Sequence, residues 1–129
     1  MKILQITLIL LLSTNVFSEK VYFINLQNGD VLKSPFLVQF GLSGKGVAPA
    51  GVEVPNTGHH HLLINIDELD FKMPIPSSKQ HLHFGMGQTE TTLDLPAGKH
   101  KLQLILGDKY HIPHNPPLAS EVIEVTVIE

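Results

Sequence analysis

Hydrophobic and polar residues alternate along most of this chain with a period of two. Residues 36–40 are typical, because Phe36, Val38 and Phe40 alternate there with Leu37 and Gln39. In a β-strand successive side chains point to opposite faces, so this pattern predicts strands with one face toward a core. Seven short strands are predicted, at residues 21–26, 36–40, 61–66, 80–84, 89–95, 100–106 and 121–128.

Turn-forming residues separate the predicted strands, and no segment shows a convincing helical period. Asn28 and Gly29 follow the first strand, and Pro96, Ala97 and Gly98 lie between the fifth and sixth, which we expect to form a hairpin. Short strands with turns between them are typical of an all-β fold. We therefore predict an antiparallel two-sheet sandwich of the immunoglobulin-like type.

The first 18 residues have a different pattern. Lys2 precedes an apolar run at residues 3–12, and Val16 and Ser18 place small residues before a cleavage point. This layout is typical of a secretory signal peptide. The apolar run is about half as long as the roughly 20 residues that a spanning helix needs, which argues against a membrane anchor. We expect residues 1–18 to be cleaved and residues 19–129 to form a single exported β domain that does not insert into the membrane.

The composition excludes some functions. The chain has 9 lysines, no arginine and 12 acidic residues, so its net charge is −3 with the histidines neutral. This balance argues against a nucleic-acid partner, because nucleic-acid recognition favours a basic, arginine-rich surface. A blue-copper centre needs a cysteine thiolate, and the chain contains no cysteine. Eight histidines in so short a chain are the unusual feature.

Most of the histidines are grouped, and their spacing predicts a metal site. His59 and His61 share one face of a predicted strand, and His81 and His83 share one face of the next. Two imidazoles side by side suit zinc, copper and nickel, and a loop with two more histidines is expected to close the site. The predicted ligands are His59, His61, His81, His83, His111 and His114. Copper is preferred over zinc, because imidazole sites bind divalent copper most tightly among the common ions.

Other residues have supporting roles in this interpretation. His60 lies on the apolar face of its strand and His100 opens another strand, so both are expected to be structural. Glu90 and Asp108 are candidates to orient a metal-bound imidazole through its second nitrogen.

Two other functions are compatible with the same residues. In a metalloenzyme, three histidines and a water would hold zinc or copper, with Glu90 as a general base and an open coordination position beside it. In a scaffold domain, the histidines would form a hydrogen-bonded surface for another cell-envelope protein, and no metal would bind.

Four blocks of the sequence resemble the DUF4399 family of small exported bacterial proteins. They lie at residues 46–51, 58–64, 83–90 and 111–117, and the resemblance extends from residue 21 to residue 127. It implies a bacterial origin, a periplasmic location and one domain. The family has no assigned function and supplies no catalytic residues. The signal sequence and the resemblance predict a periplasmic location, and the histidine spacing predicts metal binding. The expected function is that of a periplasmic, histidine-rich, non-catalytic metal-binding protein.

Overall fold

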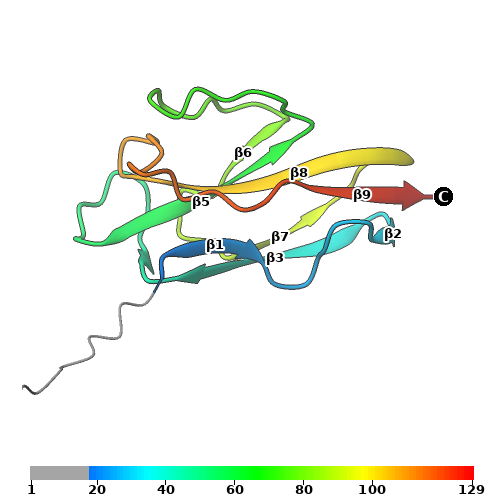
Figure 1. The fold of residues 1–129 in the computed structure, drawn as a ribbon, viewed down its shortest axis with the longest axis horizontal. Helices are drawn as coiled ribbons and strands as arrows, with labels where there is room; N and C mark the ends of the chain where they lie inside the picture. Colours follow the sequence, from blue (N-terminus) through cyan, green and yellow to red (C-terminus); the bar gives the residue numbers. More distant parts are fainter. Residues whose placement is uncertain (1–17) are drawn as a thin grey trace, which may run out of the picture.

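The computed structural model describes residues 18–129, which consist of strands and connecting loops (Figure 1). Except for Ser18, the predicted signal peptide lies outside these residues. No helix in the described part of the chain has the length and apolar character needed to cross a membrane. The strands are β1 (Lys20–Phe23), β2 (Val31–Lys33), β3 (Phe36–Ser43), β4 (Gly46–Val47), β5 (Thr57–Ile64), β6 (His81–His83), β7 (Glu90–Leu93), β8 (Gly98–Gly107) and β9 (Ile123–Ile128).

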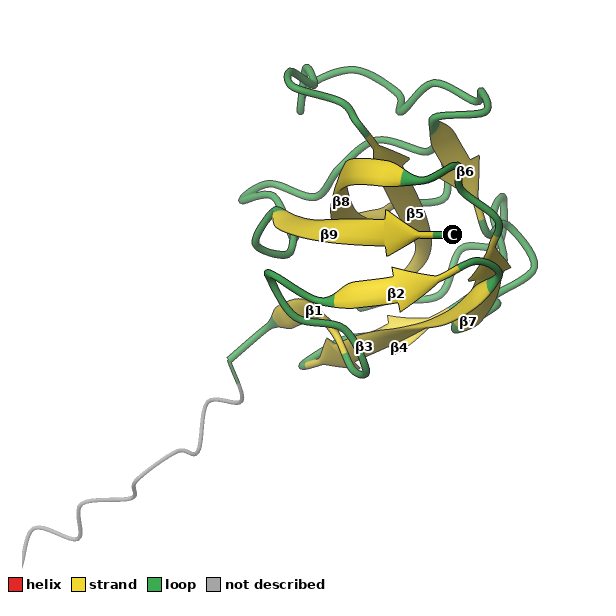
Figure 2. Ribbon diagram, turned by 90° about the vertical axis from the view of Figure 1, so that its right-hand side faces the viewer, coloured by secondary structure: helices red, strands yellow, loops and turns green. Residues whose placement is uncertain are grey.

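These strands form two sheets that face each other (Figures 1 and 2). The smaller sheet has the order β1-β3-β7. The larger sheet has the order β2-β9-β8-β5-β4, with β6 beside β5 as well, and it curls into a half-barrel (Figure 2). The predicted all-β class with two sheets is confirmed. The immunoglobulin-like topology stays a prediction.

Two features of the predicted topology are wrong. The sheets are not antiparallel throughout, because β2 runs parallel to β9 and β4 runs parallel to β5. With three and two residues, β2 and β4 are too short to show an alternation in the sequence. The predicted hairpin between the fifth and sixth strands does not form either, because β7 pairs with β3 whereas β8 pairs with β5 and β9. The turn at residues 96–98 instead carries the chain from one sheet to the other.

The main core lies between the two sheets. Its fully buried side chains alternate along the strands, as the period-two pattern predicts. They include Val38 on β3, Leu62 on β5, Leu102, Leu104 and Leu106 on β8, and Val125 on β9.

Strand β5 is buried on both faces and positions the candidate site. His60, Leu62 and Ile64 face the main core, and the alternation sends His59, His61 and Leu63 to the outer face of the larger sheet. Leu63 belongs to a second, smaller core with Ile75 and Ile105. The loops at residues 65–80 and 108–114 pack over this outer face, joined by a 2.7 Å hydrogen bond from the Ile75 amide to the His111 carbonyl. The outer face of β5 is therefore enclosed by loops rather than open to solvent.

Candidate metal centre

Four histidine rings meet on the outer face of the larger sheet. His59 and His61 come from β5, His83 from β6, and His111 from the loop after β8. The six distances between their ring centres lie between 4.6 and 5.8 Å. One ring nitrogen from each of His59, His61 and His83 can be chosen so that all three lie within 4.8 Å of one another. We call the four residues the histidine cluster.

The rings of the histidine cluster are joined in two pairs. The Nε2 atoms of His59 and His61 are 2.9 Å apart, and those of His83 and His111 are 3.1 Å apart. In each pair one Nε2–H donates to the other Nε2, so the two rings of a pair must be in opposite tautomers. The Nδ1 atom of His61 is buried without a hydrogen-bond partner among the described residues.

The strand register explains why His83 joins the cluster and His81 does not. β6 runs antiparallel to β5, with His83 opposite His61 and His81 opposite Leu63. His81 therefore lies four residues beyond His59 in the register, about 13 Å along the strand, which is too far for its ring to share one ion with His59. The His81 ring instead forms a 2.8 Å hydrogen bond with the Ser78 hydroxyl.

His114, the sixth predicted ligand, also lies outside the cluster. Its ring packs beside Gly58, where a Cβ atom would come within 2.8 Å of the His114 Nε2. That nitrogen is buried and has no hydrogen-bond partner among the described residues. The structure thus brings together four of the six predicted ligands.

Two glycines leave the space that the rings occupy, and the sequence analysis missed both. A Cβ atom on Gly107 would lie 2.9 Å from the His61 Nε2, and a Cβ atom on Gly85 would overlap the His83 ring. Gly85 follows His83 by two residues, and Gly107 lies opposite His59 on β8. Where the backbone must pass close to a side chain, only glycine leaves enough room, so glycines near the candidate histidines were a usable signal in the sequence.

The loop that carries His111 has a strained backbone held by Asp108. His111 has a φ of 67°, in the left-handed region that side chains other than glycine seldom adopt. One carboxylate oxygen of Asp108 accepts hydrogen bonds from the amides of Tyr110, at 2.8 Å, and Ile112, at 3.0 Å. Asp108 therefore acts on the backbone of the loop, not on an imidazole nitrogen as the sequence interpretation proposed.

Removing this carboxylate is expected to weaken any ligand that binds the cluster. In Asp108→Ala the loop loses two charge-assisted hydrogen bonds, so His111 is no longer held toward His83, and the dissociation constant for metal should rise about tenfold or more. Asp108→Asn keeps one acceptor oxygen and should retain most of the affinity. Metal titration of both variants checks this, with Asp67→Ala as a matched control, since Asp67 forms an exposed ion pair with Lys101. Equal affinities for all three variants would contradict the role given to Asp108.

Burial favours the neutral form of His59, His61 and His83. Burial, with smaller contributions from the neighbouring histidines, lowers the pKa of His59 from 6.5 to about 4 and that of His61 to about 3. Burial and the nearby His111 also lower the pKa of His83. Neutral imidazole is the form that binds a metal ion, so these three rings need not lose a proton to bind one at neutral pH.

The remaining candidates from the sequence lie elsewhere. His60 is fully buried against Phe40 in the main core, with ring centres 5.1 Å apart. His100 bonds to Asn65 and to the Pro96 carbonyl. Both therefore have the structural positions expected of them.

Glu90 does not reach the histidine cluster. It lies on β7 in the smaller sheet, where its carboxylate accepts a 3.1 Å hydrogen bond from the Gln39 side chain. The sequence interpretation that gave Glu90 a role beside the metal is wrong, because β7 pairs with β3 and not with a strand of the larger sheet.

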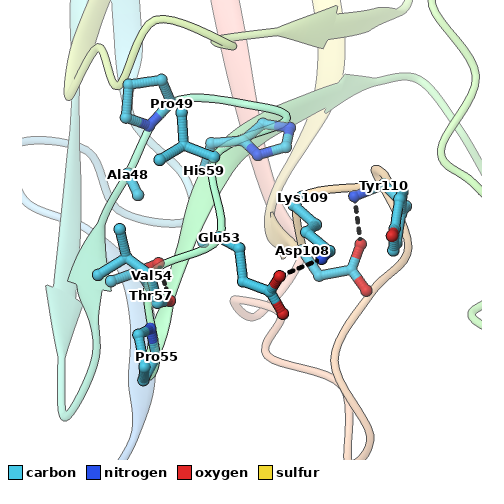
Figure 3. A pocket seen from close by; sticks show the side chains of 12 residues that line it. Ala48, Pro49, Glu53, Val54, Pro55, Thr57, His59, Asp108, Lys109 and Tyr110 are labelled. Atoms are coloured by element: carbon cyan, nitrogen blue, oxygen red, sulfur yellow. Dashed lines mark hydrogen bonds and ion pairs between the residues drawn. The ribbon is translucent and has the colours of Figure 1, made fainter.

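Histidines of the cluster line two cavities. The smaller one, of about 190 Å³, is lined by Pro74, Ile75, Pro76, Ser77, His61, His83 and His111. The larger one, of about 370 Å³, has the buried His59 among its lining residues (Figure 3). A 2.8 Å ion pair between Glu53 and Lys109 bridges the two loops that form its walls (Figure 3). His83 is exposed whereas His59 and His61 are 1% exposed, so the cluster has a buried floor and a rim open to solvent.

Comparison with known proteins places the chain in a family. The comparison with curated proteins finds no match. Among solved structures, the endo-β-1,4-mannanase from Thermotoga petrophila is similar, with a TM-score of 0.50 and 16% identity over 87% of this chain and 20% of the mannanase chain. The chain thus spans about a fifth of the mannanase, and at this identity the likeness concerns the fold alone. The family model described as a domain of unknown function, DUF4399, matches residues 38–128, so this chain belongs to the DUF4399 family.

Proposed function

We propose that this protein is an exported, non-catalytic metal-binding protein of the bacterial periplasm. It binds copper, with zinc as the alternative ion, through His59, His61 and His83, and His111 supplies a fourth imidazole. One observation carries the proposal: three ring nitrogens from β5 and β6 lie within 4.8 Å of one another. Imidazole nitrogen is a suitable ligand for both copper and zinc.

The burial of His59 and His61 favours metal binding over a scaffold role. Both rings are 1% exposed, and burial makes their charged forms unfavourable. The only hydrogen bond between these two rings joins their Nε2 atoms. Apolar side chains at these positions would extend the small core around Leu63 and Ile105 without burying polar nitrogens. A site that keeps costly polar groups in a core is typical of a function that needs them.

The surroundings of the cluster favour binding over catalysis. The cluster itself contains no carboxylate, and Asp108, in the adjoining loop, already holds two backbone amides. Glu90, the predicted general base, lies on the other sheet. Among the described residues, the predicted general base thus lies away from the cluster, which favours binding over the metalloenzyme alternative.

The periplasmic location rests on the first 18 residues. Their charged, apolar and small-residue segments have the layout of a cleavable export signal. A second envelope protein that delivers or receives the metal is the partner we propose.

Two variants of β6 provide the test of metal binding. We expect the untagged protein, residues 19–129, to bind one equivalent of copper or zinc, and His83→Ala to raise the dissociation constant about 100-fold or more. His81→Ala is the matched control, because this residue lies on the same strand, opposite Leu63 rather than His61. It should bind metal as the parent protein does. Metal content after purification and calorimetric titration measure both effects.

Three results would contradict the proposal. They are an absence of stoichiometric binding at neutral pH, an equal loss in both variants, and full binding by His83→Ala.

A further inference from the structure

We infer that the histidine cluster selects cations with a filled d shell, Zn²⁺ and Cu⁺, over Cu²⁺ and Ni²⁺ in their square-planar form. The inference rests on the proposed function, since it concerns which ion that site accepts. It is carried by the arrangement of the four rings in space, which the strands and one loop impose.

The distances between ring centres do not fit a square plane. With a metal–nitrogen bond of about 2.05 Å, each ring centre lies about 3.2 Å from the ion, so a tetrahedral set has ring centres about 5.2 Å apart. A square-planar set has four distances of about 4.5 Å and two diagonals of about 6.4 Å, the diagonals joining different pairs. The longest distance observed, 5.8 Å, is between His61 and His111, and the complementary pair, His59 and His83, is only 5.0 Å apart. No pairing of the four rings supplies two diagonals.

The three ligands on strands β5 and β6 give the same result without His111. Their ring centres are 4.7 Å apart for His59 and His61, 5.0 Å for His59 and His83, and 5.1 Å for His61 and His83. Three corners of a square would include one separation of about 6.4 Å. A nearly equilateral triangle is instead the face of a tetrahedron, and the His111 ring lies within 5.8 Å of all three corners.

The surroundings resist flattening of this arrangement. His61 is enclosed by the backbone of Gly107, where even a Cβ atom would lie 2.9 Å from its Nε2. The loop of His111 is held by Asp108 and by the amide of Ile75. His83 is constrained by pairing with β5 and by the turn at Gly85. A square-planar ion would have to move one of these elements, and the cost would reduce its affinity.

The filled d shell is what removes this cost. Zn²⁺ has no preferred geometry arising from its d electrons, and Cu⁺ has the same electron count. Cu²⁺ and Ni²⁺ gain ligand-field energy in tetragonal sites. An imidazole site that can adapt its geometry therefore follows the usual order of divalent-metal affinities, in which both ions rank high. The cluster therefore holds copper in its cuprous form, and its affinity order departs from that of an adaptable site.

Cobalt and copper spectroscopy on the protein of residues 19–129 test the geometry. We expect Co²⁺ to give the intense visible bands of four-coordinate cobalt, and bound Cu²⁺ to give an electron paramagnetic resonance spectrum with the small parallel hyperfine splitting of a flattened tetrahedron. Competition should show Zn²⁺ binding at least about tenfold more tightly than Ni²⁺. Cu⁺, kept reduced and measured against a colorimetric chelator, should bind in one equivalent. His81→Ala should reproduce these spectra, and His111→Ala should shift the cobalt bands.

The outcomes separate this inference from the proposed function. Weak cobalt bands of a six-coordinate ion, a tetragonal Cu²⁺ spectrum and tighter binding of Ni²⁺ than of Zn²⁺ would overturn the geometry while leaving a metal site in place. No binding of any ion would instead remove the proposed function itself.

Discussion

Saturating Zn²⁺ or Cu⁺ is expected to raise the melting temperature of the metal-free protein by about 10 °C or more. An ion that binds only the folded state stabilises it by about 2.7 kcal/mol at 100 times its dissociation constant and by about 4.1 kcal/mol at 1,000 times. For a domain of this size each kcal/mol corresponds to about 4 °C. Thermal unfolding followed by circular dichroism, with and without the ion, measures the shift.

The ion would add a connection between three segments that is present only in the folded state. His83 is on the short edge strand β6, His111 is in a loop, and both would be tied to the buried strand β5. A chelator should reverse the shift, and a His59→Ala/His61→Ala variant should show none. His81→Ala should behave as the parent protein. A melting temperature that does not respond to either ion at a thousandfold excess over the protein would contradict a folded-state metal site.

The metal-free protein is expected to lose stability between pH 6.5 and pH 4. An unfolded histidine has a pKa near 6.5, whereas burial lowers the pKa of His60 to about 4 and that of His61 to about 3. In this window the unfolded chain binds protons that the folded chain does not, so unfolding becomes more favourable as the pH falls. The contribution of these histidines is fully present above pH 6.5 and is lost progressively below it.

His60 allows this effect to be measured apart from the metal site. Its pKa is lowered by burial alone, and a difference of about 2.5 units corresponds to a loss on the order of 3 kcal/mol at full protonation. Both of its ring nitrogens are buried without hydrogen-bond partners among the described residues. His60→Leu should therefore raise the free energy of unfolding by about 1 kcal/mol at pH 7, and by more at pH 5, while metal affinity stays unchanged.

Urea denaturation in the presence of a chelator, at half-unit steps from pH 7.5 to pH 4.5, measures both proteins. Comparing the two proteins cancels the contribution of carboxylates such as Glu53 and Asp67, whose pKa values their lysine partners lower, because both proteins contain them. A stability that does not change across the range, or a His60→Leu curve parallel to that of the parent, would show that buried histidines do not control the acid response.

The alternation in the sequence was sufficient to predict the all-β class and the burial of particular faces. The period of two is a local property of a strand, so it correctly separated His60, in the main core, from His59 and His61 on the opposite face. The same pattern could not reveal β2 and β4, which are too short to repeat it. It also could not show that the chain crosses between sheets at residues 96–98, because a turn sequence does not specify which strands pair beyond it.

The sequence by itself determined which residue types were available for the site and which of them share a strand face. It named the six histidines, and it placed His81 and His83 on one face of their strand. Only the tertiary structure decided that His83, opposite His61, joins the cluster while His81, opposite Leu63, does not. It also decided that His111 approaches His83 and that Glu90 lies on the other sheet. The physical reason is that a metal site depends on distances of a few ångströms between strands distant in sequence, and those distances follow from register and loop packing rather than from any local pattern.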